Sequence, residues 1–480
     1  MSGLADETRW MDATDQAALV AKAEVTPSEL LEAAIERIER SNPSLNAVVI
    51  EWFDHARSVA ADPALPDGPF RGVPFLLKDL YTNFAGQTMS NGNVALKEAA
   101  KIDTTDTTLV ARFKATGLVI AGRTNTSEMG SLPTAQPLAW GPTRNPWGLD
   151  RTSGGSSGGA AAAVAAGMVP FANASDGGGS IRIPASCCGL VGLKPSQGRT
   201  TVGPARAEVG LGVELCVSRT VRDTARLLDA VRGPGVGDAV IAPAPQRPYV
   251  EELGAESGRL RIGLLDVHPR GGFLHEDCVT AVRAAASMLE GLGHIVEPAW
   301  PACLSDGTLA EKFMALWAVQ LAMAAREFGQ TLGRELTADD NEPVNWVHVE
   351  RARRLTAVDY AAAEVAGWAF RRTLQQWWAD GWDLLLTPTV AEPPLPLTEF
   401  ENNPEHPTAP MRRAGQFAAF TPPFNMSGQP AISLPLHRNA EGLPIGVQLA
   451  AAYGQEDLLI RVAAQLEAAH PWLSERPLIP

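Results

Sequence analysis

The chain has 480 residues, of which 45% are hydrophobic and 20% charged, and its formal net charge is −14. This length and composition indicate a globular protein with a large core, within the size of one extended α/β unit. The negative charge repels nucleic acid and anionic membranes, so we expect neither as a partner.

The N-terminus and the cysteines predict a cytoplasmic protein. Residues 1–8 lack the positive charge and the apolar stretch of a signal peptide. No apolar run reaches the roughly 18 residues of a membrane span, and the run over 160–169 is too short. The five cysteines are an odd number without metal-binding spacing. We therefore expect reduced cysteines and an activity without metal or cofactor.

Helices and strands alternate through the first part of the chain. Thr26 and Glu29 form a capping-box pattern before a predicted helix over 30–40, which has leucine, isoleucine and alanine on one face. A strand over 73–77, a helix over 107–116 and a strand over 118–121 follow. This alternation predicts an α/β fold, with a mixed β-sheet core covered by helices on both faces.

Lys78 stands at the end of the apolar strand over 73–77. A lysine buried there loses hydration of its charged form, which lowers its pKa toward neutrality and makes it a candidate general base. The alternative is a structural lysine whose ammonium group reaches solvent from the strand end. This segment alone leaves both interpretations open.

Two glycine and serine loops flank an alanine-rich helix predicted over 160–166. The first loop, over 154–159, also satisfies the G-x-S-x-G pattern of a nucleophile elbow. That motif follows a buried strand, whereas residues 145–152 read as a loop, so we reject the elbow. Flexible turns are the other alternative, but linkers rarely adjoin an alanine helix and an apolar segment.

In the second loop, Gly177, Gly178 and Gly179 precede Ser180, and a strand-like segment over 181–183 follows. Successive amides of residues without Cβ can form a concave set of donors beside the Ser180 oxygen. An oxyanion hole next to a nucleophile requires this arrangement. The sequence therefore predicts a nucleophilic serine at this loop.

The histidines offer no evident base for this serine. All eight stand in polar or loop-like contexts away from the two serine loops, and we interpret each as a surface residue or a structural histidine with its hydrogen bonds met: His55, His268, His275, His294, His348, His406, His437 and His470.

The second half of the chain begins after a proline- and glycine-rich linker over 233–258, which we expect to cross the surface. A strand over 261–267 and a helix over 276–292 follow. The less patterned region over 304–420 holds six tryptophans. Aromatic side chains can line an apolar pocket, so we expect this region to determine substrate choice, although most of these tryptophans pack in the core.

The chain resembles the amidase signature family of serine hydrolases. The resemblance lies in Gly-Val-Pro-Phe-Leu-Leu-Lys-Asp (72–79), Gly-Gly-Ser-Ser-Gly-Gly (154–159) and Asp-Gly-Gly-Gly-Ser-Ile-Arg-Ile-Pro-Ala-Ser (176–186). Ser156 and Ser180 stand 24 positions apart, as the family motif demands. The similarity runs roughly from Ala17 to Leu466 and, within the family, is greatest to the 6-aminohexanoate cyclic-dimer hydrolases.

The resemblance implies a role for each matching residue. Ser180 would be the nucleophile, Ser156 a bridging serine after a cis peptide bond from Gly155, and Lys78 the terminal base. The amides of Gly177, Gly178, Gly179 and Ser180 would form the oxyanion hole. Ser175 and Gly177 depart from the threonine, and the threonine or isoleucine, of many members.

The resemblance also implies one amidase domain over 1–480. Within it we expect a catalytic core over about 60–230, the linker over 233–258, a variable pocket region over 304–420 and a C-terminal block over 421–466. Met129, Trp317 and Gln320 are the candidate substrate-binding residues. Gln320 or a neighbour stands where the cyclic-dimer hydrolases carry a cysteine that contributes to substrate handling.

The resemblance implies an amidohydrolase for small linear or cyclic amides, including nylon-type oligomers, aryl amides or carbamates. A homodimer is one assembly compatible with it. One alternative is the amidase subunit of a glutamine-dependent tRNA amidotransferase, which the acidic charge disfavours. Another is a catalytically silent binding protein, which the intact Lys78, Ser156 and Ser180 disfavour.

Overall fold

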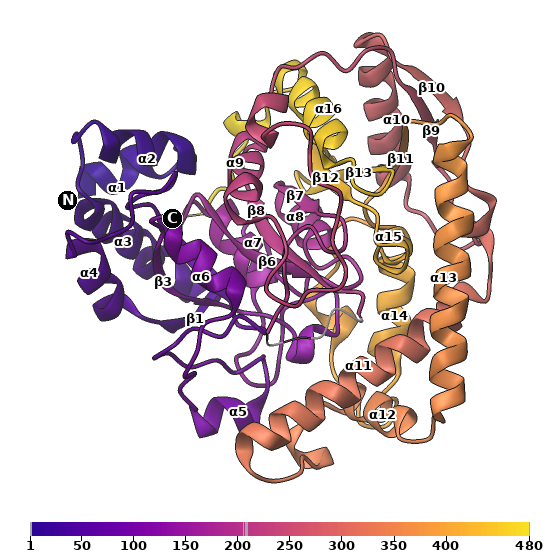
Figure 1. The fold of residues 1–480 in the computed structure, drawn as a ribbon, viewed down its shortest axis with the longest axis horizontal. Helices are drawn as coiled ribbons and strands as arrows, with labels where there is room; N and C mark the ends of the chain where they lie inside the picture. The colour runs from indigo at the N-terminus through magenta and orange to yellow at the C-terminus, as the bar shows by residue number, and fades with distance from the viewer. Residues whose placement is uncertain (1, 205, 207–209, 480) are drawn as a thin grey trace.

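The computed structural model describes residues 2–204, 206 and 210–479. Its centre is a mixed eight-stranded sheet with the order β10-β9-β11-β13-β12-β7-β8-β6 (Figure 1). Strands β9, β10 and β11 pair in parallel, and the other neighbours pair antiparallel. The strands in that order are Ile295–Pro298, Arg261–Leu264, Leu384–Pro388, Pro444–Ala451, Ala431–Arg438, Val191–Lys194, Val213–Ser218 and Phe171–Asp176.

A three-stranded sheet with the order β1-β3-β2 lies beside this centre, because β2 runs next to β6. Its strands are β1 (Val48–Glu51), β3 (Val119–Thr124) and β2 (Pro74–Lys78). Every residue of β2 and β3 is buried. The apolar strand that ends at Lys78 is therefore an interior strand, as the sequence predicts.

Helices surround the two sheets, and the fold class predicted from the sequence is confirmed. Helix α8 packs on the central strands β13, β12 and β7 of the large sheet, and α7 packs on β6 and β8 at one edge. Helices α9, α10 and α16 also pack on this sheet. The helices are α1 (Ser2–Thr8), α2 (Ala13–Ala21), α3 (Pro27–Leu45), α4 (Phe53–Ala61), α5 (Val94–Ala99), α6 (Thr108–Ala115), α7 (Gly158–Ala165), α8 (Arg182–Cys188), α9 (Val221–Val231), α10 (Glu276–Gly291), α11 (Leu309–Leu332), α12 (Pro343–Ala352), α13 (Ala357–Ala379), α14 (Ala409–Phe417), α15 (Pro422–Ser427) and α16 (Glu456–Ala469).

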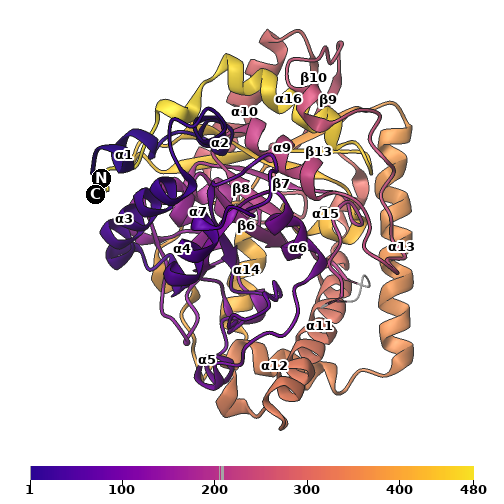
Figure 2. The ribbon, with the colours of Figure 1, turned by 60° about the vertical axis from the view of Figure 1, so that its left-hand side comes forward.

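The sequence predicted the positions of several helices and strands correctly. Helix α3 begins with the predicted capping box, in which Thr26 and Glu29 each bond the backbone of the other. Helices α6, α7 and α10 and strands β2, β3 and β9 also form where the sequence predicts them. Helices α11 to α13, from the predicted pocket region, stand on the side of the molecule away from both chain termini (Figures 1 and 2).

Two local predictions were wrong. The predicted strand over 181–183 is instead the start of α8, because the Asp176 carboxylate accepts the N–H groups of Ile181 and Arg182 and caps a helix there. Pro184 is tolerated in that first turn. The predicted loop over 145–152 is a hairpin of β4 (Arg144–Asn145) and β5 (Gly148–Thr152). Strand β5 is largely exposed, so it is not the buried strand of a nucleophile elbow.

None of the helices among the described residues combines the length and apolar character that a membrane span needs.

Candidate active site

Lys78 ends β2 inside the protein and is fully buried. Its Nζ lies 2.7 Å from the Ser156 Oγ and 2.9 Å from the Ser175 Oγ. Its backbone N–H donates to the side chain of Asn173 on β6. The structure thus brings Lys78 and Ser156 together, and it adds Ser175, which the sequence marked only as a departure from the family pattern.

Burial lowers the pKa of Lys78 to about 7, because the ammonium form loses its hydration. The carboxylates of Glu214 and Asp176 favour the ammonium form, whereas the nearby Arg206 opposes it. A substantial fraction of Lys78 is therefore an uncharged amine near neutral pH. An uncharged amine has a lone pair and can accept the proton of Ser156.

Ser156 lies in the first glycine and serine loop, directly before α7. The Gly155–Ser156 peptide bond is cis, as the resemblance implies. Neighbouring Ser157 holds this loop to β6, since its hydroxyl bonds both the N–H and the C=O of Ser175. The loop is thus joined to the strand whose Ser175 contacts Lys78.

Ser180 occupies the second loop, between β6 and α8, and is 8% exposed. Gly179 has φ of +134°, in a region that favours glycine. Its N–H donates to Asp176 at 2.8 Å, so this amide of the four expected in the oxyanion hole is already engaged. Among the described residues, the N–H groups of Gly177, Gly178 and Ser180 have no partner.

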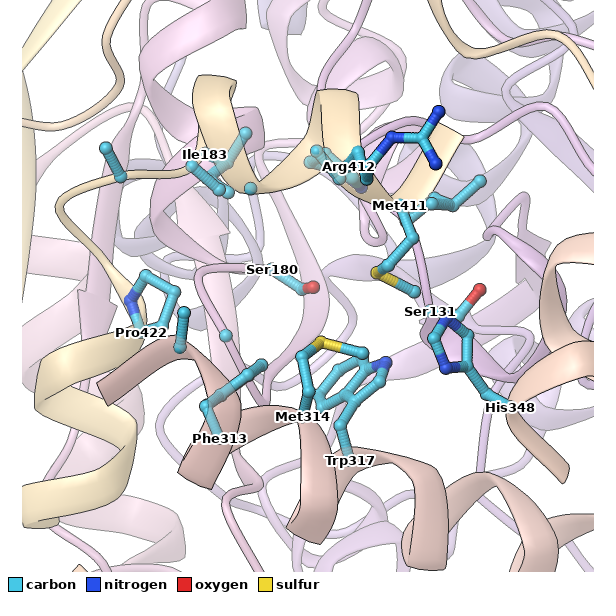
Figure 3. Close-up of a pocket in the computed structure, with 18 of the residues that line it drawn as sticks. Ser131, Ser180, Ile183, Phe313, Met314, Trp317, His348, Met411, Arg412 and Pro422 are labelled. Carbon is cyan, nitrogen blue, oxygen red and sulfur yellow. The ribbon is translucent and has the colours of Figure 1, made fainter. Parts of the chain in front are cut away.

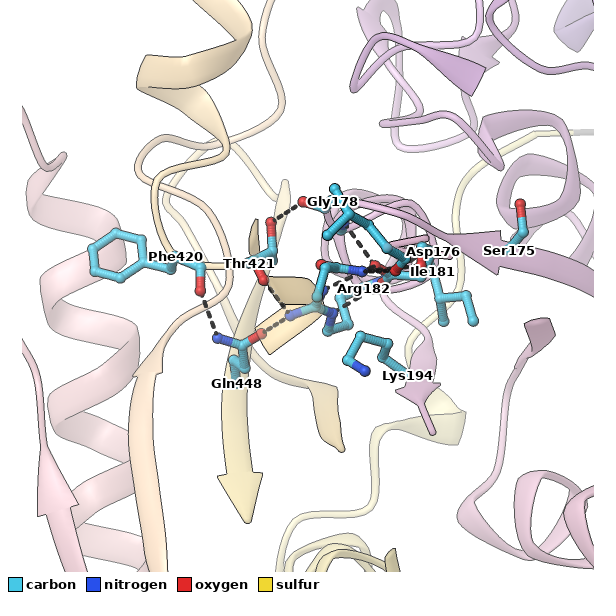
Figure 4. Close-up of polar contacts among 12 residues, drawn as sticks. Ser175, Asp176, Gly178, Ile181, Arg182, Lys194, Phe420, Thr421 and Gln448 are labelled. Atoms are coloured by element: carbon cyan, nitrogen blue, oxygen red, sulfur yellow. Dashed lines mark hydrogen bonds and ion pairs between the residues drawn. The ribbon is translucent and has the colours of Figure 1, made fainter. Parts of the chain in front are cut away.

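Arg182 holds this loop in place through several hydrogen bonds (Figure 4). Its guanidinium bonds both carboxylate oxygens of Asp176 at 2.9 Å, and both side chains are fully buried. It also donates to the backbone of Thr421 and to the side chains of Asn425 and Gln448. Burial alone would raise the pKa of Asp176, but Arg182 lowers it to about 2. Asp176 therefore remains a carboxylate.

A cavity of about 420 Å³ opens above Ser180. Phe313, Met314 and Trp317 from α11 lie along one side of it in Figure 3, and Met411 from α14 lies opposite. A smaller cavity of about 60 Å³ is lined by both Ser156 and Ser180. No hydrogen bond joins these two hydroxyls among the described residues. A carbonyl at Ser180 would face a largely apolar chamber.

The three candidate substrate-binding residues all lie at this site. Met129, Trp317 and Gln320 line the small cavity, and Trp317 lines the large one as well. Trp317 stacks on Phe313 with ring centroids 5.3 Å apart. Of the other tryptophans in the region 304–420, Trp377 packs against both Trp378 and Trp382.

The interpretation of His348 from sequence was wrong. It lines the large cavity from α12, is 6% exposed, and neither ring nitrogen has a hydrogen-bond partner in the described structure. Ser131 lines the same cavity, is also 6% exposed, and its hydroxyl is likewise unpartnered. No sequence pattern marked either residue, and His348 stands far along the chain from the serine loops.

Across the described residues, no cluster of three or more histidine, cysteine, aspartate or glutamate side chains is arranged to hold a metal ion.

Comparison with known proteins finds one matching family and several similar proteins. The Amidase family matches residues 29–460. A 6-aminohexanoate-cyclic-dimer hydrolase of Paenarthrobacter ureafaciens is 44% identical, covering 98% of this chain and 96% of its own. A structure of 6-aminohexanoate cyclic dimer hydrolase complexed with substrate superposes with a TM-score of 0.95 at 43% identity, covering 98% and 99% of the two chains. A bacterial aryl acylamidase superposes with a TM-score of 0.87 at 28% identity, covering 98% of each chain.

Proposed function

The chain belongs to the amidase signature family of amide-hydrolysing enzymes, and from this premise we propose that it cleaves small linear or cyclic amides through Ser180, Ser156 and Lys78. The observation that carries the proposal is the 2.7 Å contact between the Lys78 Nζ and the Ser156 Oγ. This contact lies inside a buried site that opens at Ser180.

In the proposed reaction, the Ser180 Oγ attacks the amide carbon while its proton passes to Ser156, and the Ser156 proton passes to the uncharged Lys78 amine. The new O–C bond sends an electron pair onto the carbonyl oxygen. Collapse of this intermediate breaks the C–N bond, and the proton returns through Ser156 to the leaving nitrogen. Water then hydrolyses the acyl-enzyme by the same relay.

The negative oxygen of the intermediate needs donors that are already in place. The unpartnered N–H groups of Gly177, Gly178 and Ser180 are suitable, whereas that of Gly179 is engaged by Asp176. The Asp176–Arg182 pair would then act as a support that keeps the loop in shape, without contact to the substrate.

Substrates are proposed from the cavity and from the relatives. The apolar lining by Phe313, Met314 and Trp317 suits aliphatic or aryl amides. The relatives are named for a cyclic 6-aminohexanoate dimer and for aryl acylamides. We therefore propose nylon-type oligomers, aryl amides and carbamates as the classes to test. The tRNA amidotransferase role is not favoured, because the net charge of −14 disfavours a nucleic-acid partner.

The test is replacement of Ser180 by alanine. Turnover of a panel of anilides, ω-amino acid amides, carbamates and glutamine should fall by about three orders of magnitude or more. Labelling by a fluorophosphonate should disappear at the same time. Ser257→Ala is the matched control, because Ser257 lies in a remote exposed segment and bonds Gln465. Near wild-type kcat in Ser180→Ala would exclude Ser180 as the nucleophile.

A further inference from the structure

Three arginines are among the residues that line the cavity above Ser180, and two of them, Arg351 and Arg412, are also exposed to solvent. Arg270, Arg351 and Arg412 line it, whereas no aspartate or glutamate among the described residues does. None of the three guanidinium groups forms an ion pair with a described carboxylate, and Arg412 donates only to the hydroxyl of Thr408. Burial lowers the pKa of Arg270, which shows that its charge is partly withdrawn from water. An anion in the cavity would compensate this charge.

His348 and Ser131 supply unmet hydrogen-bonding groups to the same cavity. Burial, together with the charge of Arg351, lowers the pKa of His348. The ring is therefore neutral near pH 7, with one N–H donor and one acceptor nitrogen. Leaving such buried groups unsatisfied carries a free-energy cost. A ligand that accepts hydrogen bonds from His348 and Ser131 would remove this cost.

The arrangement separates this polar end from the reacting serine. In Figure 3, His348 and Ser131 lie at one end of the cavity, and Met314, Trp317 and Met411 border the space between them and Ser180. Arg351 follows His348 on α12 at a spacing that places the two on the same helix face. A ligand that reaches from Ser180 to His348 must cross apolar surface.

We propose that the amide substrate carries a carboxylate, joined to its reacting carbonyl by an apolar chain, and that His348, Ser131 and Arg351 bind this carboxylate. The inference rests on the proposed function, because that function places the reacting carbonyl at Ser180. A second neutral amide group would satisfy His348 and Ser131 but would form no ion pair with Arg351. A substrate ammonium group would be repelled by all three arginines.

The experiment compares matched 4-nitroanilides. The carboxylate series contains the mono-anilides of linear dicarboxylic acids with four to eight carbons. The neutral series contains alkanoic anilides of the same chain lengths, and the cationic series the corresponding ω-amino acid anilides. For the carboxylate that fits best, we expect kcat/KM about tenfold or more above its neutral counterpart. We also expect the preference to weaken as salt is added.

Two variants locate the binding site, and one serves as the control. Arg351→Gln and His348→Leu should each lower kcat/KM for the carboxylate anilide about tenfold while changing that of the neutral anilide less than about threefold. Arg353→Gln is the matched control, because Arg353 lies on the same stretch of chain but pairs with Glu350 and does not line the cavity. Arg353→Gln should leave kcat/KM for both substrates unchanged.

Equal or lower kcat/KM for the carboxylate series than for the neutral or cationic series would overturn the inference. Equal losses on both substrates in Arg351→Gln and His348→Leu would also overturn it, since a structural role predicts that result. Calorimetric binding to Ser180→Ala separates the two proposals. If the wild type cleaves no member of the panel of anilides, ω-amino acid amides and carbamates, the proposed function fails. Tighter binding of the carboxylate anilide to Ser180→Ala would still support the carboxylate site, and equal binding would reject it.

Discussion

The chemistry of Lys78 depends on a few neighbouring atoms. As an ammonium group it would donate to Ser156 and Ser175 and leave its third proton without a partner that the structure provides. As an uncharged amine it can donate to Ser175 and accept from Ser156. Complete burial favours the uncharged form, and lowers the pKa of Lys78 to about 7. The serine at 175 thus orients the lone pair toward the relay.

We predict that kcat/KM rises with pH through about 7 and then levels off, because a base with a lowered pKa becomes active as it loses its proton. The measurement is a pH profile on one neutral anilide, with the melting temperature recorded over the same range. The melting temperature is needed because burial also lowers the pKa of Lys194 to about 7, so stability can change over the same pH range. A profile that stays flat down to pH 5 in folded protein would contradict an amine base.

At the scale of elements, one buried carboxylate joins the two segments that carry Ser131 and His348. Glu128 belongs to the short 3₁₀ turn Glu128–Gly130 beside the active site. Its oxygens accept from the side chains of Asn93 and Asn345 at 2.7 Å and from the N–H of Glu342 at 2.8 Å. Asn345 and Glu342 stand at the start of α12, so Glu128 positions that helix.

Burial and the nearby Glu342 raise the pKa of Glu128 to about 8. Above that pH, Glu128→Gln should destabilise the protein by about 1–3 kcal/mol, because an amide N–H₂ would face donors where the carboxylate accepts. It should also raise KM, since the turn and α12 both line the cavity. Denaturant unfolding and steady-state kinetics measure the two effects. Glu350→Gln, on the exposed part of α12, is the control and should unfold like the wild type. Wild-type stability in Glu128→Gln would show that the carboxylate does not hold the helix.

At the scale of the whole molecule, the Arg182 guanidinium connects segments from distant parts of the chain. It joins Asp176, at the end of β6, to Thr421 and Asn425 around the start of α15 and to Gln448 on β13. The loop that carries Ser180 therefore depends on C-terminal segments, around α15 and on β13, for its shape. Because Arg182 lowers the pKa of Asp176 to about 2, the stability from this carboxylate is present above about pH 4 and is lost as pH falls toward 2.

Arg182→Met should cost about 3–5 kcal/mol of unfolding free energy, because it leaves a buried carboxylate without its counter-charge. Activity per folded molecule should also fall, since Asp176 holds the Gly179 N–H. Thermal unfolding and active-site titration measure the two changes. Arg57→Met is the control, because Arg57 pairs with Glu32 on the surface. A similarly small change in unfolding free energy in Arg182→Met and Arg57→Met would show that the buried Asp176–Arg182 pair does not stabilise the fold.

The sequence by itself determined the features that depend on neighbouring residues. The capping box at Thr26 and Glu29, the apolar strand that ends at Lys78, and the glycine loops around Ser156 and Ser180 are local patterns. Each restricts the backbone or the burial of its own segment, so each could be found without knowledge of the fold. These patterns were enough to identify the family and the fold class.

The tertiary structure alone decided which partner each polar group has. Residues 181–183 begin a helix, and the Gly179 N–H donates to Asp176. Ser175 contacts Lys78, and His348 lies beside the cavity without a hydrogen-bond partner among the described residues. The physical reason is that burial and hydrogen-bond partners arise where distant segments pack together. Residues such as His348 and Arg182 acquire their surroundings only from such packing, and no pattern within their own segments encodes it.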